Sequence, residues 1–286
     1  MTEIIDTNNI INKINTEITE ALKNASRYPK AVFIQIGNNQ SSEKYIKMKQ
    51  RACEKVNIKS EHIKLPNSIT HNQLIDIIRK LNKDSDIDGI LIQLPLPEQI
   101  NCYEIINSIS SNKDVDGLTS ENILNFESDQ HHLISCIPAI IINILKEKDI
   151  NLNNSNVLIC GKNNVAFYPM LNIFAKFSHS ITICDETYKK LPELVANNDI
   201  VISCENRPNI IKSIWLKENA IAFDIGNSYI DDFSSPKGYR IVGDIEFNPS
   251  VCKASYITPV PGGMGQLGIA QLVYNIFKAY QNNRGK

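Results

Sequence analysis

Apolar and polar positions form two kinds of segment that alternate along the chain, and this alternation predicts an α/β protein. Short runs rich in Ile, Leu and Val are typical of strands that are buried on both faces of a parallel sheet. In the first half these runs lie at 31–36, 59–65 and 87–94. Helical spacing predicts helices at 8–24, 42–57, 70–82 and 102–109.

A second alternating series begins after the polar stretch NLNNSN at 151–156 and is typical of a Rossmann-like unit. A short helix and a helix at 138–148 precede it. Its strands are expected at 156–160, 180–184, 200–204 and 220–224, with helices at 165–177 and 267–280. We therefore expect two domains with mostly parallel sheets. One is a three-layer α/β domain of residues 1–137 and 267–286, and the other is a Rossmann-like domain of residues 138–266.

Charge and hydropathy exclude several classes of partner. Thirty basic and 31 acidic residues give a net charge of −1, so no excess positive potential would attract nucleic acid. The longest apolar runs, such as 137–145, are shorter than the roughly 20 residues that span a bilayer. The first residues, MTEIIDTNNI, lack the pattern of a signal peptide. We expect a cytoplasmic protein with no nucleic-acid or membrane partner.

The cysteines and histidines do not indicate a disulfide framework or a metal site. The seven cysteines form no CxxC pair and lie among apolar residues, a pattern typical of reduced, packed thiols. His131 and His132 are adjacent, but no zinc-ligand spacing accompanies them. We therefore expect neither disulfides nor a bound metal.

An amide stands inside an apolar run in DGILIQLPLPEQI, residues 88–100. Pro95 cannot donate to a central ladder, so the strand should end near Leu94 and place Gln93 at its carboxyl end. Open parallel sheets bind ligands beyond these ends. The alternative is a buried Gln that bonds a neighbouring backbone group, and the pattern alone leaves both readings open.

A lysine lies within the apolar stripe of the helix that contains YIKMKQRACEKV. Tyr45, Ala52 and Val56 share one face, and Lys49 belongs to the same stripe. Partial burial disfavours the ammonium form and moves the pKa of a lysine towards neutral pH, where it serves as an acid or base. The alternative is a side chain that runs along the surface and keeps its ammonium in water.

Consecutive β/α units place the start of this helix and the end of the later strand on the same rim of the sheet. Lys49, Tyr45 and Gln93 are therefore expected to converge there. The loop KDVDGL adds Asp114 and Asp116. A lysine, an amide, a phenol and a carboxylate around one cleft form a candidate acid/base site.

With these residues the chain resembles the bifunctional methylenetetrahydrofolate dehydrogenase/methenyltetrahydrofolate cyclohydrolase (FolD) family. The resemblance extends from about Ile4 to the final helix. Its order of motifs is highly specific as a set. The matching stretches are YIKMKQRACEKVNI, DGILIQLPLP, KDVDGL, CIP, GKNNVAFYP, GDIEF and ASYITPVPGGMG.

The resemblance implies a role for each residue of the candidate site. Lys49 would be the catalytic lysine and Gln93 the amide that holds and tunes its amine. Tyr45 would stack on the aminobenzoate ring of the folate, and Asp116 would accept hydrogen bonds from the pterin. One wall of the folate cleft would come from residues 259–263. The residues expected there are Pro259, Val260, Gly262 and Gly263.

The implied activity has two steps and uses tetrahydrofolate derivatives as substrates. A hydride leaves 5,10-methylenetetrahydrofolate for a nicotinamide, and water then adds to the methenyl product to give 10-formyltetrahydrofolate. The first step requires orientation beside the cofactor, and the second requires proton transfer. The resemblance also implies a homodimer, and the final helix and the apolar strands after Arg240 are compatible with one.

The expected dinucleotide site departs from the family pattern. Where the family shows GRSxxVGxP, this chain has Lys162 for Arg, Asn163 for Ser and Ala166 for Gly. Where the family shows an AxGxP turn, it has Asn206 for Gly. A lysine still meets phosphate, but it lacks the planar fork of arginine. The cofactor-binding residues that the resemblance implies are Gly161, Lys162, Asn163, Val165, Pro169, Glu186, Asn206, Asn227 and Gly268.

These departures leave three accounts of the cofactor open. NADP would bind if Lys162 or Arg207 neutralised its 2′-phosphate. NAD would be preferred if Asp185 and Glu186 bound the free ribose hydroxyls. Alternatively, the dehydrogenase has decayed and cyclohydrolase chemistry persists. Two other classes of protein are a catalytically silent folate-binding subunit and an unrelated nicotinamide dehydrogenase.

Overall fold

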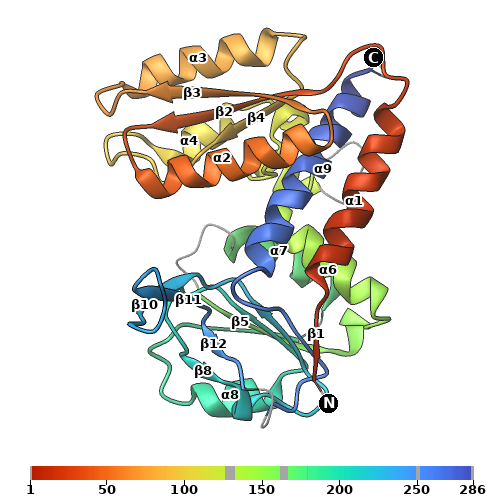
Figure 1. The fold of residues 1–286 in the computed structure, drawn as a ribbon, viewed down its shortest axis with the longest axis vertical. Coiled ribbons are helices and arrows are strands. Elements are labelled where there is room, and N and C mark those ends of the chain that lie inside the picture. Colours follow the sequence, from red (N-terminus) through yellow and green to blue (C-terminus); the bar gives the residue numbers. More distant parts are fainter. Residues whose placement is uncertain (1, 126–132, 162–166, 179, 249–251, 285–286) are drawn as a thin grey trace. The chain divides into compact units, whose positions relative to one another are not determined.

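The computed structural model describes residues 2–125, 133–161, 167–178, 180–248 and 252–284. It divides into two compact units (Figure 1). The folate-side unit comprises Ile11–Cys136 and Ile269–Lys286, and the dinucleotide-side unit comprises Met1–Ile10 and Ile137–Gly268. No helix among the described residues has the length and apolar character needed to cross a membrane.

The folate-side unit is built on a three-stranded parallel sheet. Strand β2 (Lys30–Ile36) lies between β3 (Lys59–Leu65) and β4 (Gly89–Ile92). Because side chains alternate across a strand, β2 contributes to two separate cores. Phe33 packs into one core and Ile34 packs into the other.

Helices cover both faces of this sheet. Residues of α1 (Thr7–Leu22), α2 (Gln40–Lys55) and α9 (Met264–Arg284) share the core that contains Phe33. The core that contains Ile34 is shared with α3 (His71–Lys83) and α4 (Cys102–Asn107). Figure 1 shows α2 and α3 on opposite sides of the sheet. The predicted three-layer α/β arrangement is confirmed. The short helix predicted after KDVDGL is α5 (Ser120–Asn125).

Local capping sets the start of the helices that frame the candidate site. The Asn39 side chain accepts a hydrogen bond from the Ser42 backbone N–H at 3.0 Å, so α2 begins at Gln40, two residues before the expected position. Thr70 and Gln73 form a reciprocal capping box at the start of α3. Each cap satisfies backbone donors that the first turn leaves unpaired.

The dinucleotide-side unit contains a six-stranded parallel sheet in the order β1-β13-β9-β7-β5-β6. These strands are β1 (Glu3–Ile4), β13 (Tyr256–Ile257), β9 (Ile221–Asp224), β7 (Ile200–Ser203), β5 (Asn156–Cys160) and β6 (Ser180–Cys184). The connecting helices are α6 (Cys136–Glu147), α7 (Phe167–Phe177) and α8 (Leu191–Asn197). The chain moves from β5 to β6 on one side and then crosses to β7 on the other. The carboxyl ends of β5 and β7 therefore flank a topological switch point, where Rossmann-like sheets bind dinucleotides.

The smallest elements have no counterpart in the sequence prediction. The two-residue strand β1 pairs with β13, and the first ten residues belong to the dinucleotide-side unit, whereas the sequence analysis assigned them to the other domain. Two residues carry no measurable periodicity, and only the pairing partner reveals such a strand. Other elements without a predicted range include strand β13, helix α8, the hairpin of β10 (Ser228–Asp231) and β11 (Tyr239–Val242), and the pair β8 (Ile211–Lys212) and β12 (Ile245–Glu246).

A buried carboxyl group at the end of β9 organises the neighbouring loops. Asp224 accepts hydrogen bonds from the backbone N–H groups of Gly226 at 2.9 Å, Asp244 at 3.0 Å and Ile245 at 2.8 Å. An added Cβ at Gly243 would lie only 1.9 Å from an Asp224 oxygen, so this approach requires glycine. Burial raises the pKa of Asp224 to about 7, and the nearby Asp244 also raises it.

Asp244 extends the same network to the loop after β7. Its carboxylate accepts from the Ser203 hydroxyl at 2.9 Å, the Glu205 N–H at 2.7 Å and the Arg207 N–H at 2.8 Å. These bonds fix the backbone at the carboxyl edge of the sheet, where a dinucleotide is expected.

We predict that Asp224→Asn destabilises this unit by about 1–3 kcal/mol, because its amide nitrogen cannot accept from a backbone N–H. The ordinary pKa is 3.8 and the folded pKa is about 7, so the folded protein retains a proton that the unfolded chain loses. The associated stability is complete below the ordinary pKa and is lost as pH rises through 7. Urea unfolding at about pH 5 and about pH 8 can be followed by the fluorescence of the single tryptophan, Trp215. The free energy of unfolding should fall more between these pH values in wild type than in the variant. Equal losses would show that Asp224 does not titrate in this range.

Candidate active site

A lysine lies in the centre of the inward face of α2. The buried side chains of this helix are Ser42, Ile46, Lys49 and Cys53. Tyr45 and Ala52, which the expected stripe included, are half-buried beside this face. The true stripe is therefore rotated towards Lys49, whose exposed fraction is only 7%. The alternative of an ammonium held in bulk water is wrong for this side chain.

The end of β4 supplies the partner of this lysine. Gln93 continues the ladder by donating its backbone N–H to Ile34 O at 2.8 Å, although β4 ends one residue earlier. Its Nε2 donates to Leu94 O at 2.9 Å, and this bond turns Oε1 towards the helix. Lys49 Nζ donates to that Oε1 at 3.1 Å. Gln93 thus bonds a neighbouring backbone group, as one reading expected, and Lys49 as well. Its place beside a bound ligand stays a prediction.

Burial lowers the pKa of Lys49. The negative charge of Asp116 opposes this shift, and Cys136 and Cys53 oppose it further. The Lys49 Nζ lies 5.3 Å from the centroid of the Tyr45 ring, within the range of a cation–π contact. Burial also raises the pKa of Tyr45, with Asp116 as the next cause, so its hydroxyl stays protonated.

The two carboxylates of KDVDGL have different environments. Asp114 is buried and accepts from Gly117 N–H at 3.1 Å, Thr119 N–H at 2.7 Å and Asn122 Nδ2 at 3.0 Å. It therefore organises the loop. Asp116 is half-buried and is the carboxylate that acts electrostatically on Lys49.

Four residues expected at the dinucleotide site follow strands at the carboxyl edge of the six-stranded sheet: Gly161, Glu186, Asn206 and Asn227. Gly161 follows β5 with a φ of +126°, and an added Cβ would lie 2.7 Å from the Cys204 backbone. Asn206 has a φ of +57° and accepts from Asn227 N–H at 3.3 Å. Asn thus takes the left-handed conformation where the family has glycine. Lys162, Asn163 and Val165 lie outside the described residues.

Glu186 lies within a small charged group beside this edge. Arg207 Nη2 contacts Glu186 Oε1 at 2.9 Å. Glu205 Oε1 accepts from the Glu186 N–H at 3.2 Å. Burial and a side-chain hydrogen bond with Glu186 raise the pKa of Glu205 to about 7. Of the acidic pair Asp185 and Glu186 that the sequence showed, Glu186 is therefore paired with an arginine.

Two expected cofactor residues have packing roles. Pro169 is buried within α7. A Cβ at Gly268 would lie 3.0 Å from Ile137 Cδ1, so glycine permits close packing of α9 against α6.

The PVPGG segment, residues 259–263, contains a tight turn. Gly262 has a φ of +99°, and a Cβ at Gly263 would lie 2.1 Å from Pro259 O. The role of this segment as a wall of the folate cleft stays a prediction.

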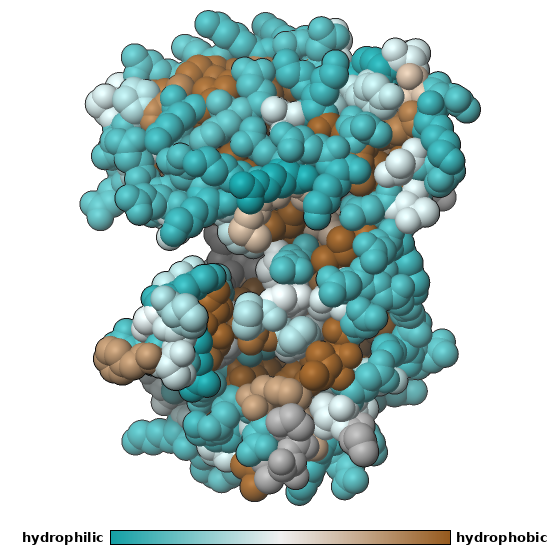
Figure 2. All heavy atoms as spheres, viewed as in Figure 1, coloured by the Kyte–Doolittle hydropathy of each residue, from teal (hydrophilic) through white to brown (hydrophobic). Residues whose placement is uncertain are grey.

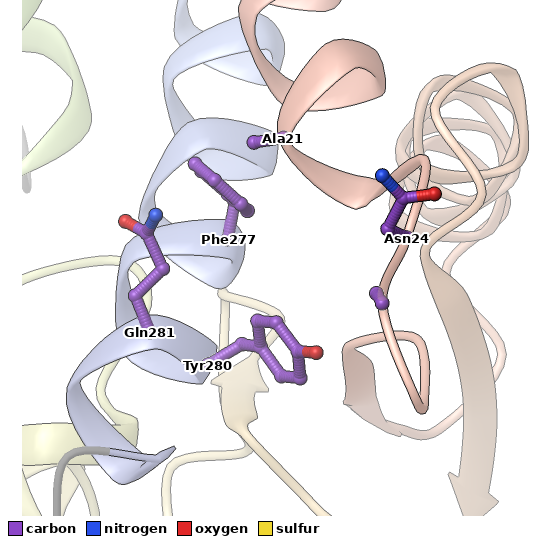
Figure 3. Close-up of a pocket in the computed structure, with 6 residues that line it drawn as sticks. Ala21, Asn24, Phe277, Tyr280 and Gln281 are labelled. Atoms are coloured by element: carbon purple, nitrogen blue, oxygen red, sulfur yellow. The ribbon is translucent and has the colours of Figure 1, made fainter.

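A surface hollow of about 530 Å³ lies between α1 and α9 (Figure 3). Its lining comprises Ala21, Asn24, Ala25, Phe277, Tyr280 and Gln281. The Tyr280 hydroxyl donates to Arg27 O at 2.7 Å and is committed to the fold. The hollow therefore offers no acid, base or nucleophile. Elsewhere in the described chain, no cluster of three or more His, Cys, Asp or Glu residues could hold a metal ion.

Comparison with known families decides the assignment. The model of the tetrahydrofolate dehydrogenase/cyclohydrolase catalytic domain matches residues 5–116, and the model of the NAD(P)-binding domain of that family matches residues 135–284. The chain belongs to the tetrahydrofolate dehydrogenase/cyclohydrolase family. The resemblance noted in the sequence is confirmed.

Individual members of the family resemble nearly the whole chain. Bifunctional protein FolD of Campylobacter curvus is 36% identical over 273 residues, which cover 94% of this chain and 93% of the relative. The structure of the bifunctional enzyme FolD of Campylobacter jejuni has a TM-score of 0.88, 33% identity and 99% coverage of both chains. FolD of Trypanosoma brucei, solved with NADP and an inhibitor, has a TM-score of 0.89 and 26% identity, and covers 98% of this chain and 97% of its own.

Cys136 is a site neighbour that the sequence analysis noted only as part of CIP. Its thiol approaches Asp116 Oδ1 and Val115 O at 3.7 Å each. Asn275 Nδ2, from α9, donates to Val115 O at 2.9 Å and contacts the Cys136 sulfur at 3.6 Å. Burial raises the pKa of Cys136 well above its ordinary value, and Asp116 raises it further. In sequence, one cysteine among apolar residues gives no signal beyond packing.

Gln35 is a second neighbour that the sequence analysis missed. The register pairs Ile34 with Ile92, so Gln35 lies next to Gln93 across the ladder. Its Nε2 donates to Gly37 O and Asn39 O at 3.3 Å each, and its buried Oε1 has no hydrogen-bond partner among the described residues. The available signal was a polar residue at an alternating position of a strand that is otherwise apolar.

We predict that the Lys49 amine titrates below the ordinary lysine pKa of 10.5. Asp116→Asn should lower that pKa further, because it removes the charge that favours the ammonium form. NMR of protein labelled with ¹³C at lysine Cε measures both values, and loss of the signal in Lys49→Arg assigns it. A wild-type value at or above 10.5 would rule out a shielded amine.

Proposed function

We propose that this protein oxidises 5,10-methylenetetrahydrofolate to 5,10-methenyltetrahydrofolate with a nicotinamide cofactor and hydrolyses the product to 10-formyltetrahydrofolate. The observation that carries the proposal is the buried Lys49 amine, which is bonded at 3.1 Å to Gln93. Membership of a family whose domains carry these activities in their description supports both steps. The enzyme would thus interconvert tetrahydrofolates in one-carbon metabolism.

In the hydrolytic step, Lys49 would transfer protons at the reacting carbon. A water oxygen forms a bond to the methenyl carbon, and the neutral Lys49 amine accepts the proton that leaves this oxygen. The ammonium then returns the proton to the pterin ring nitrogen as its bond to this carbon breaks. The remaining hydroxyl proton is released to solvent as the C=O bond forms, which leaves the formyl group on the other nitrogen. A lowered pKa makes both roles available near neutral pH, and the bond to Gln93 holds the amine in place.

Tyr45 and Asp116 would hold the substrate beside this amine. The Tyr45 ring is half-buried and close to Nζ, so it can stack on the aminobenzoate ring. Asp116 would accept hydrogen bonds from the amino group and ring nitrogen of the pterin. We propose that Pro259, Val260, Gly262 and Gly263 also contact the folate, because Gly263 allows a tight turn over Pro259 O and a Cβ at Gly262 would have no atom within 4 Å.

For the oxidative step, the bound dinucleotide supplies the hydride acceptor. The residues present fit such a group. Gly161 allows close backbone approach at the end of β5. The strand connections leave β5 first towards β6 and then towards β7 on its other side, which creates the topological switch point. We propose that Lys162, Asn163, Val165, Asn206 and Asn227 contribute to the same site. Their task is to hold the dinucleotide with its nicotinamide oriented for hydride transfer.

We propose NADP as the cofactor, with Arg207 as the partner of its 2′-phosphate. Arg207 lies beside Glu186 and has an exposed side chain that can turn to an anion. A second carboxyl group, Glu205, has a raised pKa, so the local negative charge is smaller than the sequence indicates. NAD stays an alternative, and substitutions at Arg207 and Glu186 distinguish the two cofactors.

The alternatives of a cyclohydrolase without dehydrogenase activity and of a silent folate-binding subunit have no specific support. The Gly161 turn keeps the left-handed backbone that close approach requires, and Asn206 adopts it in place of glycine. The Lys49–Gln93 contact is intact. A nicotinamide dehydrogenase unrelated to folate is wrong, because the catalytic-domain model of the folate family matches residues 5–116.

We further propose that the protein is a cytoplasmic homodimer. The hairpin β10–β11 carries Tyr229, which is 62% exposed, and Phe233, at its tip, is 97% exposed. Figure 2 shows apolar surface among the polar side chains of this hairpin, at the left edge of the picture. Exposed apolar surface of this kind is typical of protein–protein contacts. The final helix is a weaker candidate, because most of its apolar side chains are buried.

We predict that Lys49→Ala lowers the rate of methenyltetrahydrofolate hydrolysis by about 10²- to 10⁴-fold, the usual contribution of general acid/base catalysis. The assay is the absorbance loss of the methenyl compound, corrected for the uncatalysed rate. Lys47→Ala is the matched control, because Lys47 lies on the same helix but is exposed and paired with Glu43 at 3.1 Å. A Lys49→Ala variant that folds and retains wild-type turnover would disprove the assignment.

We predict that Arg207→Ala raises the Kd for NADP by about tenfold or more, the loss expected for a charge-assisted hydrogen bond. The Kd for NAD should change little, because NAD lacks the phosphate. Glu186→Gln should act in the opposite direction on NADP. Fluorescence titration measures the Kd values of wild type and of both variants. Lys212→Ala is the control, because it removes an exposed basic side chain that is likewise paired with a glutamate, Glu246. An equal loss for both dinucleotides would remove Arg207 from phosphate recognition.

A further inference from the structure

Three cysteines lie at the carboxyl edge of the six-stranded sheet, where the dinucleotide is expected. Cys160 ends β5, Cys184 ends β6, and Cys204 directly follows β7. All three are buried, and none forms a disulfide. Neither the hydrolytic nor the oxidative chemistry described above uses them.

Cys160 and Cys184 are direct partners in the sheet. The register of β5 and β6 pairs Cys160 with Cys184, so the two side chains point to the same face. They share one hydrophobic core with Leu158 and Leu191. Paired residues on neighbouring strands are about 4.8 Å apart, which falls within the range of about 4.4–6.8 Å that a disulfide requires between Cα atoms.

The two thiols already interact and differ in reactivity. The neighbouring Cys184 thiol raises the pKa of Cys160, with burial as the second cause, and the Cys160 thiol also approaches Glu205 Oε1 at 4.0 Å. The Cys160 thiol in turn lowers the pKa of Cys184 in spite of burial. Cys184 is therefore the better nucleophile, because the thiolate is the reactive form.

We propose that Cys160 and Cys184 are an oxidative modification site, at which a hydroperoxide forms a reversible disulfide that weakens dinucleotide binding. The Cys184 sulfur attacks a peroxide oxygen, the O–O bond breaks, and the leaving hydroxide takes up the thiol proton to give water and a sulfenic acid. The Cys160 sulfur then forms the S–S bond, and the S–O bond breaks with release of a second water. Two thiols are oxidised by two electrons, and one peroxide is reduced.

The effect of the disulfide on dinucleotide binding rests on the proposed function. It would act through Gly161, which directly follows Cys160. The Gly161 N–H donates to Cys184 O at 3.0 Å, so the backbone of one cysteine holds the turn that follows the other. The usual Cα separation across a disulfide is about 5.5–6 Å, so bonding the two sulfurs pushes these strand ends apart. Gly161 has no room to follow, since even a Cβ would lie 2.7 Å from the Cys204 backbone. The turn after β6, with Asp185 and Glu186, would shift as well.

Cys204 provides the matched control. Its thiol donates to Gly161 O at 3.3 Å, and burial raises its pKa to about 12. It is thus a neighbour of the pair that should not react. Cys102 and Cys252 are half-buried and report oxidation that is not specific to this edge.

The experiment treats the full-length protein with hydrogen peroxide and analyses unreduced tryptic peptides by mass spectrometry. Cleavage after Lys162 and Lys176 places Cys160 and Cys184 in different peptides. We expect one linked pair of these peptides, its loss on treatment with dithiothreitol, and its absence in Cys160→Val. Cys204→Val should still form it. Oxidation at Cys102 and Cys252 without the linked pair would overturn the proposal.

The binding consequence has a separate readout. Peroxide should raise the Kd for NADP at least tenfold in wild type and in Cys204→Val, with recovery after dithiothreitol, and should leave Cys160→Val unchanged. A linked protein with unchanged affinity would refute the regulatory effect. If the reduced protein did not bind NADP, the proposed cofactor would fail while the peptide analysis still decided the disulfide.

Discussion

The candidate chemistry depends on one desolvated amine. Lys49 lies on the inward face of α2, where a charged ammonium loses most of its hydration, and its described hydrogen bond is to Gln93 at 3.1 Å. The amide offers an acceptor without a charge, so it holds the amine and does not lock it in the protonated form as a carboxylate would. Asp116 acts electrostatically and opposes the effect of burial. Burial outweighs Asp116, and the pKa of the amine is lowered.

The sheet topology explains why such different residues meet. A parallel strand ends where the next loop begins, so all carboxyl ends of one sheet share an edge. In the folate-side unit this edge gathers Gln93, the start of α2 and the loop of Asp114, which bridges to Ile90 of β4. In the dinucleotide-side unit it gathers Gly161, Glu186 and Arg207. Buried carboxylates with backbone partners, Asp114 in one unit and Asp224 in the other, stiffen these edges.

The redox pair and the departures in the dinucleotide site belong to the same edge. Cys160 and Cys184 are neighbours because β5 and β6 are neighbours in register, and the chain shows no motif that links them. Asn206 illustrates the opposite case. Its replacement of a family glycine was visible in the sequence, and its left-handed conformation followed from the tolerance of Asn for that region. The partnership of Arg207 with Glu186 required the folded chain, because 21 positions separate them.

The sequence by itself determined the alternation of strands and helices, the three-layer and Rossmann-like architecture, and the position of Gln93 at a strand end, because apolar period and proline chemistry act locally. It also carried the family motifs. Only the tertiary structure decided that Lys49 is buried, that Cys136 and Gln35 lie beside the site, and that β1 joins the second sheet. These features depend on what packs against a residue from distant segments, and no local pattern records that contact.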